Sequence, residues 1–206
     1  MDRVAGLRER KKDQARRRIA EVALDLFAER GFEAVTVNEI AERAEVAKAT
    51  LFKYFPTKES LVLQGVSGDS LAAVVTGRPA GQPIVDALRA HFLAQAAEPG
   101  PDPTDTLRRV RIITASPVLR ERATALHYRQ RLTLAAALAQ QFPELTASLL
   151  AAQISAVVQT LQERYVFSDV PVQERGDRLR HEIEVALTML RHTIAHAEIA
   201  HAEGAH

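Results

Sequence analysis

Four polar side chains that could bind a nucleic acid lie close together near the start of the chain. Lys48, Thr50, Lys53 and Tyr54 fall within seven residues, with Ala49 among them. Ammonium and hydroxyl groups can bond to phosphate oxygens and to acceptors on base edges, and a small alanine allows close approach or meets a thymine methyl group. These residue types at this spacing predict contact with DNA rather than catalysis.

Two short helices joined by a turn must position these side chains. The first is expected over residues 36–44, where Thr36 and Glu39 have the spacing of a capping box. The second is expected over residues 47–55. Helices this short are unstable alone, so both should pack on a longer helix over residues 7–29, whose apolar residues recur at helical spacing.

Positive charge is concentrated at the same end of the chain. Residues 3–18 hold eight basic and two acidic side chains, although the 206-residue chain has a formal net charge of only +1. This asymmetry favours a polyanion-binding module joined to a nearly neutral remainder. A solvated helix face or a disordered tail is an equally good explanation of the run taken alone.

The composition argues against several other classes of function. The chain has no Cys, which excludes disulfides and thiolate chemistry, and we find no Gly-rich phosphate loop, nucleophile elbow or HExxH motif. We therefore expect no catalytic residue and no cofactor. The charged start lacks the apolar stretch of a signal peptide, and the longest run free of polar residues is 134–139, so we expect a soluble, cytoplasmic protein without a membrane span.

Two histidines near the C-terminal end could share a metal ion. His192 and His196 are four residues apart, the spacing that places two imidazoles on one face of a helix. No carboxylate or thiolate constellation accompanies them in the sequence, and the surrounding segment is alanine-rich. We expect no metal site.

Three motifs within residues 15–63 together resemble one protein family. They are LFAERGF, the T-V-x-E-I-A that follows it, and A-K-A-T-L-F-x-Y-F-x-T-K-E-x-L; this stretch resembles the N-terminal DNA-binding domain of TetR-family transcriptional regulators. The resemblance implies an all-α fold, with a three-helix helix-turn-helix domain followed by a C-terminal helical bundle for ligand binding and dimerisation. It places the DNA-binding domain and its basic arm at residues 1–58 and the second domain at 59–206.

The family implies a homodimeric repressor that binds a palindromic double-stranded DNA operator and is released by a small-molecule effector. A nonspecific, architectural DNA-binding protein without an effector is the alternative. The residues expected to contact DNA are Arg16, Arg17, Arg18, Thr36, Val37, Ala47, Lys48, Ala49, Thr50, Lys53, Tyr54 and Lys58. Two positions depart from the family pattern, because Ala47 stands where Ser or Thr is common and Phe52 where a hydroxylated aromatic is common. Both departures remove a hydroxyl that could bond to a phosphate.

The remainder of the chain is expected to be helical. The expected helices cover residues 57–75, 83–97, 104–114, 116–141, 143–167 and 173–200. Gly65 and Gly68 could instead end the first of these near residue 66, because glycine is unfavourable inside a helix.

An effector site is expected among the helices between residues 83 and 167. Residues 109–132 resemble the corresponding part of TetR-type regulators that sense acyl-coenzyme A thioesters, whose phosphates arginines could bind. The candidate lining is Phe92, Arg108, Arg111, Thr114, His127, Tyr128, Arg131, Gln153, Val157, Gln159 and Tyr165. For each Arg or His in this set, a solvated face or a structural role is the competing interpretation.

The last two expected helices carry long apolar stripes that the family resemblance assigns to dimerisation. The interface is expected to include Leu149, Ala156, Leu179, Ile183, Leu187, Leu190 and Ile194. Symmetric dimers are the commonest oligomers, which favours this assignment. The alternative is that the same stripes form only the core of a single chain.

Overall fold

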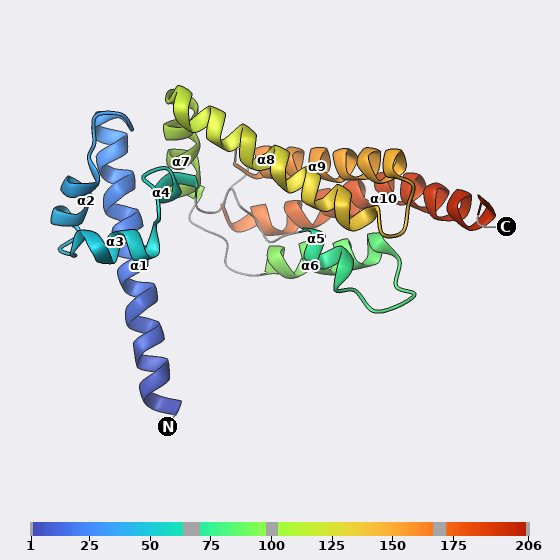
Figure 1. The fold of residues 1–206 in the computed structure, drawn as a ribbon, viewed down its shortest axis with the longest axis horizontal. Coiled ribbons are helices and arrows are strands. Elements are labelled where there is room, and N and C mark those ends of the chain that lie inside the picture. Colours follow the sequence, from blue (N-terminus) through green and yellow to red (C-terminus); the bar gives the residue numbers. More distant parts are fainter. Residues whose placement is uncertain (1, 64–70, 98–102, 167–171, 205–206) are drawn as a thin grey trace. The chain divides into compact units, whose positions relative to one another are not determined.

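The regular structure in the described part of the chain is entirely α-helical (Figure 1). A computed structural model describes residues 2–63, 71–97, 103–166 and 172–204, with side chains for residues 12–63, 71–97, 104–165 and 176–197. The helices are α1 (Asp2–Arg30), α2 (Val37–Arg43), α3 (Lys48–Tyr54), α4 (Ser60–Leu63), α5 (Leu71–Thr76), α6 (Ile84–Ala97), α7 (Pro103–Ala115), α8 (Pro117–Leu138), α9 (Glu144–Val166) and α10 (Val172–Gly204). The predicted all-α fold is confirmed.

The observed helix ends agree closely with the expected ones, with three differences. α1 begins at Asp2 rather than near residue 7, α8 ends at Leu138 rather than near residue 141, and α10 ends at Gly204 rather than near residue 200. The helix expected over 57–75 is represented by α4 and α5. Residues 64–70, where Gly65 and Gly68 could end that helix, lie outside the described residues.

The chain forms two compact units. The first unit comprises Met1–Val66 and Thr104–Ala125, and the second comprises Ser67–Pro103 and Leu126–His206. Residues 104–125 thus join the N-terminal helices, whereas the sequence placed them with the second domain. The expected boundary at residue 58, between a DNA-binding domain and a domain for ligand binding and dimerisation, stays a prediction.

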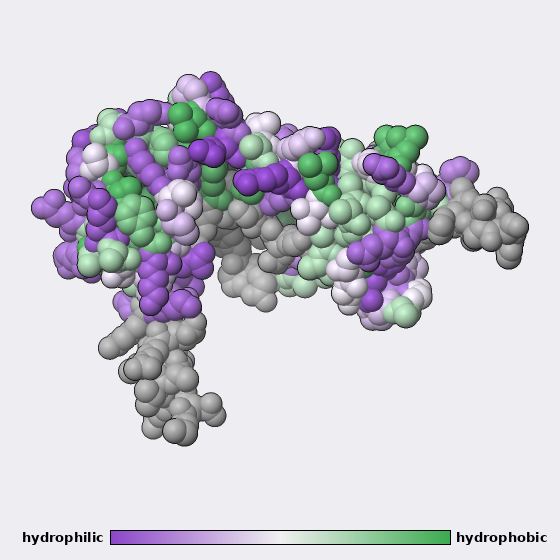
Figure 2. Space-filling model, viewed as in Figure 1, coloured by the Kyte–Doolittle hydropathy of each residue, from purple (hydrophilic) through white to green (hydrophobic). Residues whose placement is uncertain are grey.

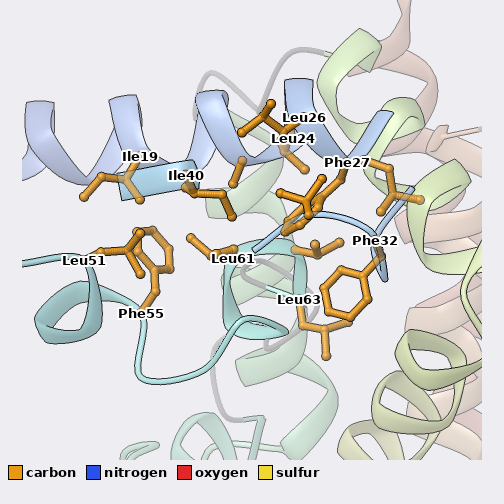
Figure 3. Close-up of a cluster of buried hydrophobic side chains, with 14 of the residues drawn as sticks. Ile19, Leu24, Leu26, Phe27, Phe32, Ile40, Leu51, Phe55, Leu61 and Leu63 are labelled. Carbon is orange, nitrogen blue, oxygen red and sulfur yellow. The ribbon is translucent and has the colours of Figure 1, made fainter. Parts of the chain in front are cut away.

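A single apolar core holds the first unit together, as Figure 3 shows. The side chains that are almost fully buried there include Ile19, Leu24 and Phe27 of α1, Ile40 of α2, Leu51 of α3 and Leu61 of α4. Ile112 of α7 and Leu119 of α8 are 6% and 0% exposed and belong to the same cluster. Burial of these two side chains explains why α7 and the start of α8 pack with the N-terminal helices.

Arginines of α7 reinforce this packing. The guanidinium of Arg109 donates to the carbonyl oxygens of Val62 at 2.8 Å and Leu61 at 3.3 Å, and burial lowers its pKa. Arg108 forms an ion pair with Asp25 of α1. The Arg109 contacts thus tie α7 to the backbone of α4.

The second unit is built around α10, which packs against both α6 and α9. Its inward stripe is almost completely covered, with Ile183, Leu187, Leu190 and Ile194 only 1–4% exposed within one chain. The prediction that these four residues form a dimer interface is therefore corrected, because the chain's own helices already bury them. Leu179 also packs against this core.

The remaining two residues of the expected interface behave differently. Leu149 is 56% exposed and Ala156 is also exposed. Both lie on the side of α9 that faces away from its buried Ile154. They remain candidates for contact with a second copy.

α9 satisfies the length and composition test for a membrane-spanning helix. An 18-residue stretch within Glu144–Tyr165 is long and apolar enough to cross a membrane by length and composition alone. Core helices of soluble proteins pass the same test, and α9 lines the second-unit core through Leu150, Ala151 and Ile154. Its apolar character is thus explained in part by packing within the chain.

Candidate DNA-binding surface

The helix α3 divides cleanly into a buried face and an outward face. Leu51 is 0% exposed and Phe55, which follows the helix, is 1% exposed. Ala49 and Lys53 lie two residues before and after Leu51, which puts each about 160° from it around the helix axis. Both are exposed, so they form the centre of the outward face.

Further polar residues flank this centre. Lys48 is exposed on one side of it, and Thr50 and Tyr54 are half-buried on the other. Tyr54 also packs against the first-unit core. The structure therefore brings Lys48, Ala49, Thr50, Lys53 and Tyr54 together on one solvent-facing surface of a rigidly packed helix.

The start of α3 lacks a side-chain cap, as its sequence predicts. Ala47 occupies the N-cap position with an extended backbone and makes no side-chain capping hydrogen bond. The expected loss of a hydroxyl cap is thus confirmed. The backbone carbonyl of Ala47 still accepts the first helical hydrogen bonds, from Thr50 and Leu51.

Thr36 and Glu39 form the predicted capping box at the start of α2. The backbone N–H and the hydroxyl of Thr36 donate to Glu39 Oε2 at 2.7 and 2.8 Å, and the Glu39 N–H donates to the Thr36 hydroxyl at 3.3 Å. The guanidinium of Arg30 also donates to Glu39 Oε1. Together with the bonds from Thr36, this contact lowers the pKa of Glu39 to about 2. The Thr36 hydroxyl is engaged within the chain, so its contact with DNA remains a prediction.

The turn between α2 and α3 passes through a left-handed residue. Glu45 has a φ of 56°, and its carboxylate pairs with the guanidinium of Arg18 at 3.0 Å. One of the three expected DNA-binding arginines therefore already has a partner in the turn. Arg16 and Arg17 are exposed on α1.

Lys58 is less available to DNA than the sequence predicts. Its ammonium group lies 4.3 Å from the ring centroid of Phe32 and 5.8 Å from that of Phe27, and donates to the Glu33 carbonyl at 3.4 Å. Burial lowers its pKa. Val37 is likewise turned to the core, where it is partly buried. Both residues stabilise the corner that positions α2 and α3.

The candidate effector residues are divided between the two units. Those in the first unit are Arg108, Arg111 and Thr114, and those in the second are Phe92, His127, Tyr128, Arg131, Gln153, Val157, Gln159 and Tyr165.

Several of these residues have other roles in the structure. Arg108 pairs with Asp25 and Asp105, and Phe92 is 8% exposed in the second-unit core. Gln153 and Gln159 face solvent. These contacts and exposures compete with the predicted ligand roles, because a helical pattern does not reveal which face a distant helix covers, and the shared pocket stays a prediction.

Sequence reasoning also missed features of the surface. It treated Phe52 only as a lost hydroxyl, yet the ring is 39% exposed. It did not assign Val185 and Met189, which are 49% and 71% exposed on α10. Their four-residue spacing indicates that both side chains lie on one face of the helix.

These features define a class of protein. Two short helices joined by a tight left-handed turn, with the second helix presenting a cationic outward face, form a helix-turn-helix domain. Residues 19–64 match the family model described as "Bacterial regulatory proteins, tetR family". The N-terminal part of the chain is therefore similar to the DNA-binding domain of the TetR family, as its motifs predict.

Curated relatives match mainly through this domain. The chain is 37% identical over 91 residues to the HTH-type transcriptional regulator TcmR of Streptomyces glaucescens, covering 43% of this chain and 40% of TcmR. It is 41% identical over 54 residues to the HTH-type transcriptional repressor KstR of Rhodococcus jostii, covering 26% of each. The chain thus spans less than half the length of these relatives. Their names are those of transcriptional regulators and not of enzymes, in agreement with the sequence expectation.

Solved structures share the fold over most of the chain. SmeT in its complex with triclosan has a TM-score of 0.56 at 20% identity, covering 86% of this chain and 90% of SmeT. GusR of Salmonella enterica has a TM-score of 0.53 at 21% identity, covering 88% and 96%. At these identities the likeness shows the helical fold alone.

Proposed function

We propose that the chain is a cytoplasmic transcriptional repressor that binds a palindromic operator as a homodimer and releases it when a small-molecule effector binds. The observation that carries this proposal is the outward face of α3. It presents Lys48 and Lys53 without any acidic side chain on the helix, and Leu51 fixes the helix on the core. A helix of this kind fits the width of a DNA major groove.

Phosphate contacts from the lysines should supply much of the affinity. Each neutralised phosphate contributes about 0.9 to the slope of log affinity against log salt concentration. Removing both lysines should therefore weaken binding strongly at low salt and flatten the slope by about 2 for each bound protomer.

The test begins with selection of binding sites from random duplexes by the purified protein. Affinity for the enriched duplex is then compared between the wild type and the Lys48→Ala/Lys53→Ala variant at several salt concentrations. Arg129→Ala, which removes an exposed arginine of α8 in the second unit, is the matched control. Unchanged binding by the double variant would remove α3 from the DNA interface. Equal affinity for enriched and random duplexes would instead favour an architectural DNA-binding protein.

The second unit offers a surface for dimerisation. Leu145 and Leu149 of α9 are 72% and 56% exposed, and Val185 and Met189 of α10 are 49% and 71% exposed. Each pair has four-residue spacing and lies opposite its helix's buried stripe. Figure 2 shows apolar side chains on the visible face of this unit.

The two apolar faces belong to neighbouring helices. Arg164 near the end of α9 pairs with Glu182 of α10 at 2.7 Å, and the two helices pack against each other. Apolar side chains this exposed on adjacent helices favour burial against a second copy. Such a dimer would hold two α3 helices for major grooves about 34 Å apart.

Effector control would act on that spacing. A ligand that binds one arrangement of the dimer better shifts the population toward it, and an arrangement with mismatched α3 helices loses operator affinity. KstR is named a repressor, which supports repression. SmeT is seen in a complex with triclosan, which supports binding of a small molecule by a protein of similar fold. Mass spectrometry of molecules that copurify with the protein is the direct search for the effector.

A further inference from the structure

We propose that Phe52 and Ala49 form an apolar contact surface on α3 that recognises the 5-methyl group of a thymine, so that each operator half-site carries an A·T pair at that position. This inference rests on the proposed function and names part of what α3 would recognise. It assigns a role in DNA recognition to a ring whose residue type departs from the family pattern.

Phe52 is exposed and does not contribute to the core of the first unit. The ring is 39% exposed, whereas Leu51 and Phe55 fill the core with 0% and 1% exposure. Among the described side chains of the first unit, the only other large apolar one with comparable exposure is Val118. An apolar ring left in water on the helix that faces DNA gains free energy when a partner covers it.

The neighbours of Phe52 define what that partner can be. Ala49 precedes it by three residues and therefore lies beside it on the helix surface. Lys48 precedes it by four, with its ammonium nitrogen 5.9 Å from the ring centroid, and Lys53 lies on the far side of Ala49. The apolar pair is thus bordered by two cations, which suits a partner that is apolar at its centre and anionic around it.

The major groove of DNA matches this description. Its floor exposes one strongly apolar group, the thymine 5-methyl, and phosphates line its edges. A phenyl ring has no group that can donate to a phosphate oxygen, so Phe52 cannot make the polar contact that a tyrosine hydroxyl makes. Contact with a methyl group removes apolar surface of both partners from water.

Deoxyribose is the other apolar surface of DNA, and it occurs in every nucleotide. A ring packed on a sugar would add affinity without sequence preference. The position of Ala49 near the centre of the outward face favours the groove floor over the backbone, because the pair then faces the base edges between the two lysines. The two alternatives differ in their response to loss of a single methyl group.

The experiment uses the full chain and the operator selected from random duplexes. Each thymine of the half-site is replaced in turn by deoxyuridine, which lacks only the 5-methyl group. We expect one position per half-site at which the wild type loses about fourfold in affinity, the effect of one buried methyl group. Phe52→Ala should bind more weakly and lose the response to deoxyuridine at that position.

Two controls keep the result interpretable. Lys48→Ala should bind more weakly but keep the deoxyuridine response, and circular dichroism checks that Phe52→Ala remains helical. If no thymine responds in the wild type, or if Phe52→Ala retains the full response, the inference is overturned while the proposed function stands. Failure to enrich any duplex sequence would overturn both.

Discussion

The hydroxyl of Ser116 donates a hydrogen bond of 2.5 Å to Oε1 of Glu33, a residue 83 positions earlier in the chain. The same hydroxyl oxygen accepts from the backbone N–H of Leu119 at 3.3 Å, so Ser116 also caps α8. Ser116 is 1% exposed, and its hydrogen bond lowers the pKa of Glu33. One buried hydroxyl thereby joins the start of α8 to the corner between α1 and α2.

Replacing Ser116 by alanine should destabilise the protein by about 1–2 kcal/mol, because a helix cap and a hydrogen bond to a carboxylate are lost together. Urea denaturation followed by circular dichroism measures the change. Thr133→Ala is the control, since that exposed hydroxyl donates only to the Arg129 carbonyl within α8. Equal effects of the two substitutions would contradict a special role for Ser116.

The capping box of α2 predicts a defined pH dependence. The folded pKa of Glu39 is about 2, below its ordinary value of 4.5, so the folded state binds fewer protons than the unfolded state between these values. The stabilisation from this carboxylate is complete above about pH 5 and is lost as the pH falls toward 2. Glu39→Gln keeps the shape without the charge, and the difference in Tm between it and the wild type should shrink over that range. A constant difference would contradict this assignment.

The left-handed turn at Glu45 predicts a stabilising substitution. A residue with a β-carbon costs about 1 kcal/mol at a φ of 56°, and its ion pair with Arg18 is exposed and weak. Glu45→Gly should therefore raise the free energy of unfolding by about 0.5–1 kcal/mol. Glu45→Val should lower it, since branched side chains disfavour this region. Urea denaturation of both variants checks the opposite signs.

A hydroxyl at the start of α3 should stabilise the recognition helix. Ala47→Ser places an acceptor beside the early N–H groups of the helix, for a gain of about 0.5–1 kcal/mol. Ala47→Val adds volume at the same site without an acceptor and should bring no gain. Thermal and urea unfolding of the two variants distinguish a capping effect from a packing effect.

Charges placed on the exposed apolar faces of α9 and α10 should prevent dimerisation. Leu149→Arg/Met189→Arg introduces positive charges that a symmetric interface would bring together and desolvate. Light scattering coupled to size exclusion should show a monomer, with operator affinity reduced at least tenfold. Thr133→Arg adds a charge to an exposed position of α8 and should leave the dimer intact. A dimeric double variant would place the interface elsewhere.

Local features of this protein were determined by the sequence alone. The capping box of Thr36 and Glu39, the missing cap at Ala47 and the helical character of the chain all followed from side chains and their near neighbours. Such features depend on groups within about four residues of each other, whose geometry a helix or turn dictates. The motifs around α3 also predicted the match of residues 19–64 to the TetR-family model.

Only the tertiary structure decided which surfaces are covered. The periodic stripe of α10 was visible in the sequence, but the folded chain buries Leu187 within its own core and leaves Met189, two residues later, exposed. From the sequence alone, Arg108 could bind a ligand or pair with another side chain. In the folded chain it pairs with Asp25, which lies far away in the sequence. Hydrophobic spacing marks a face that some surface will cover, and long-range packing selects that surface.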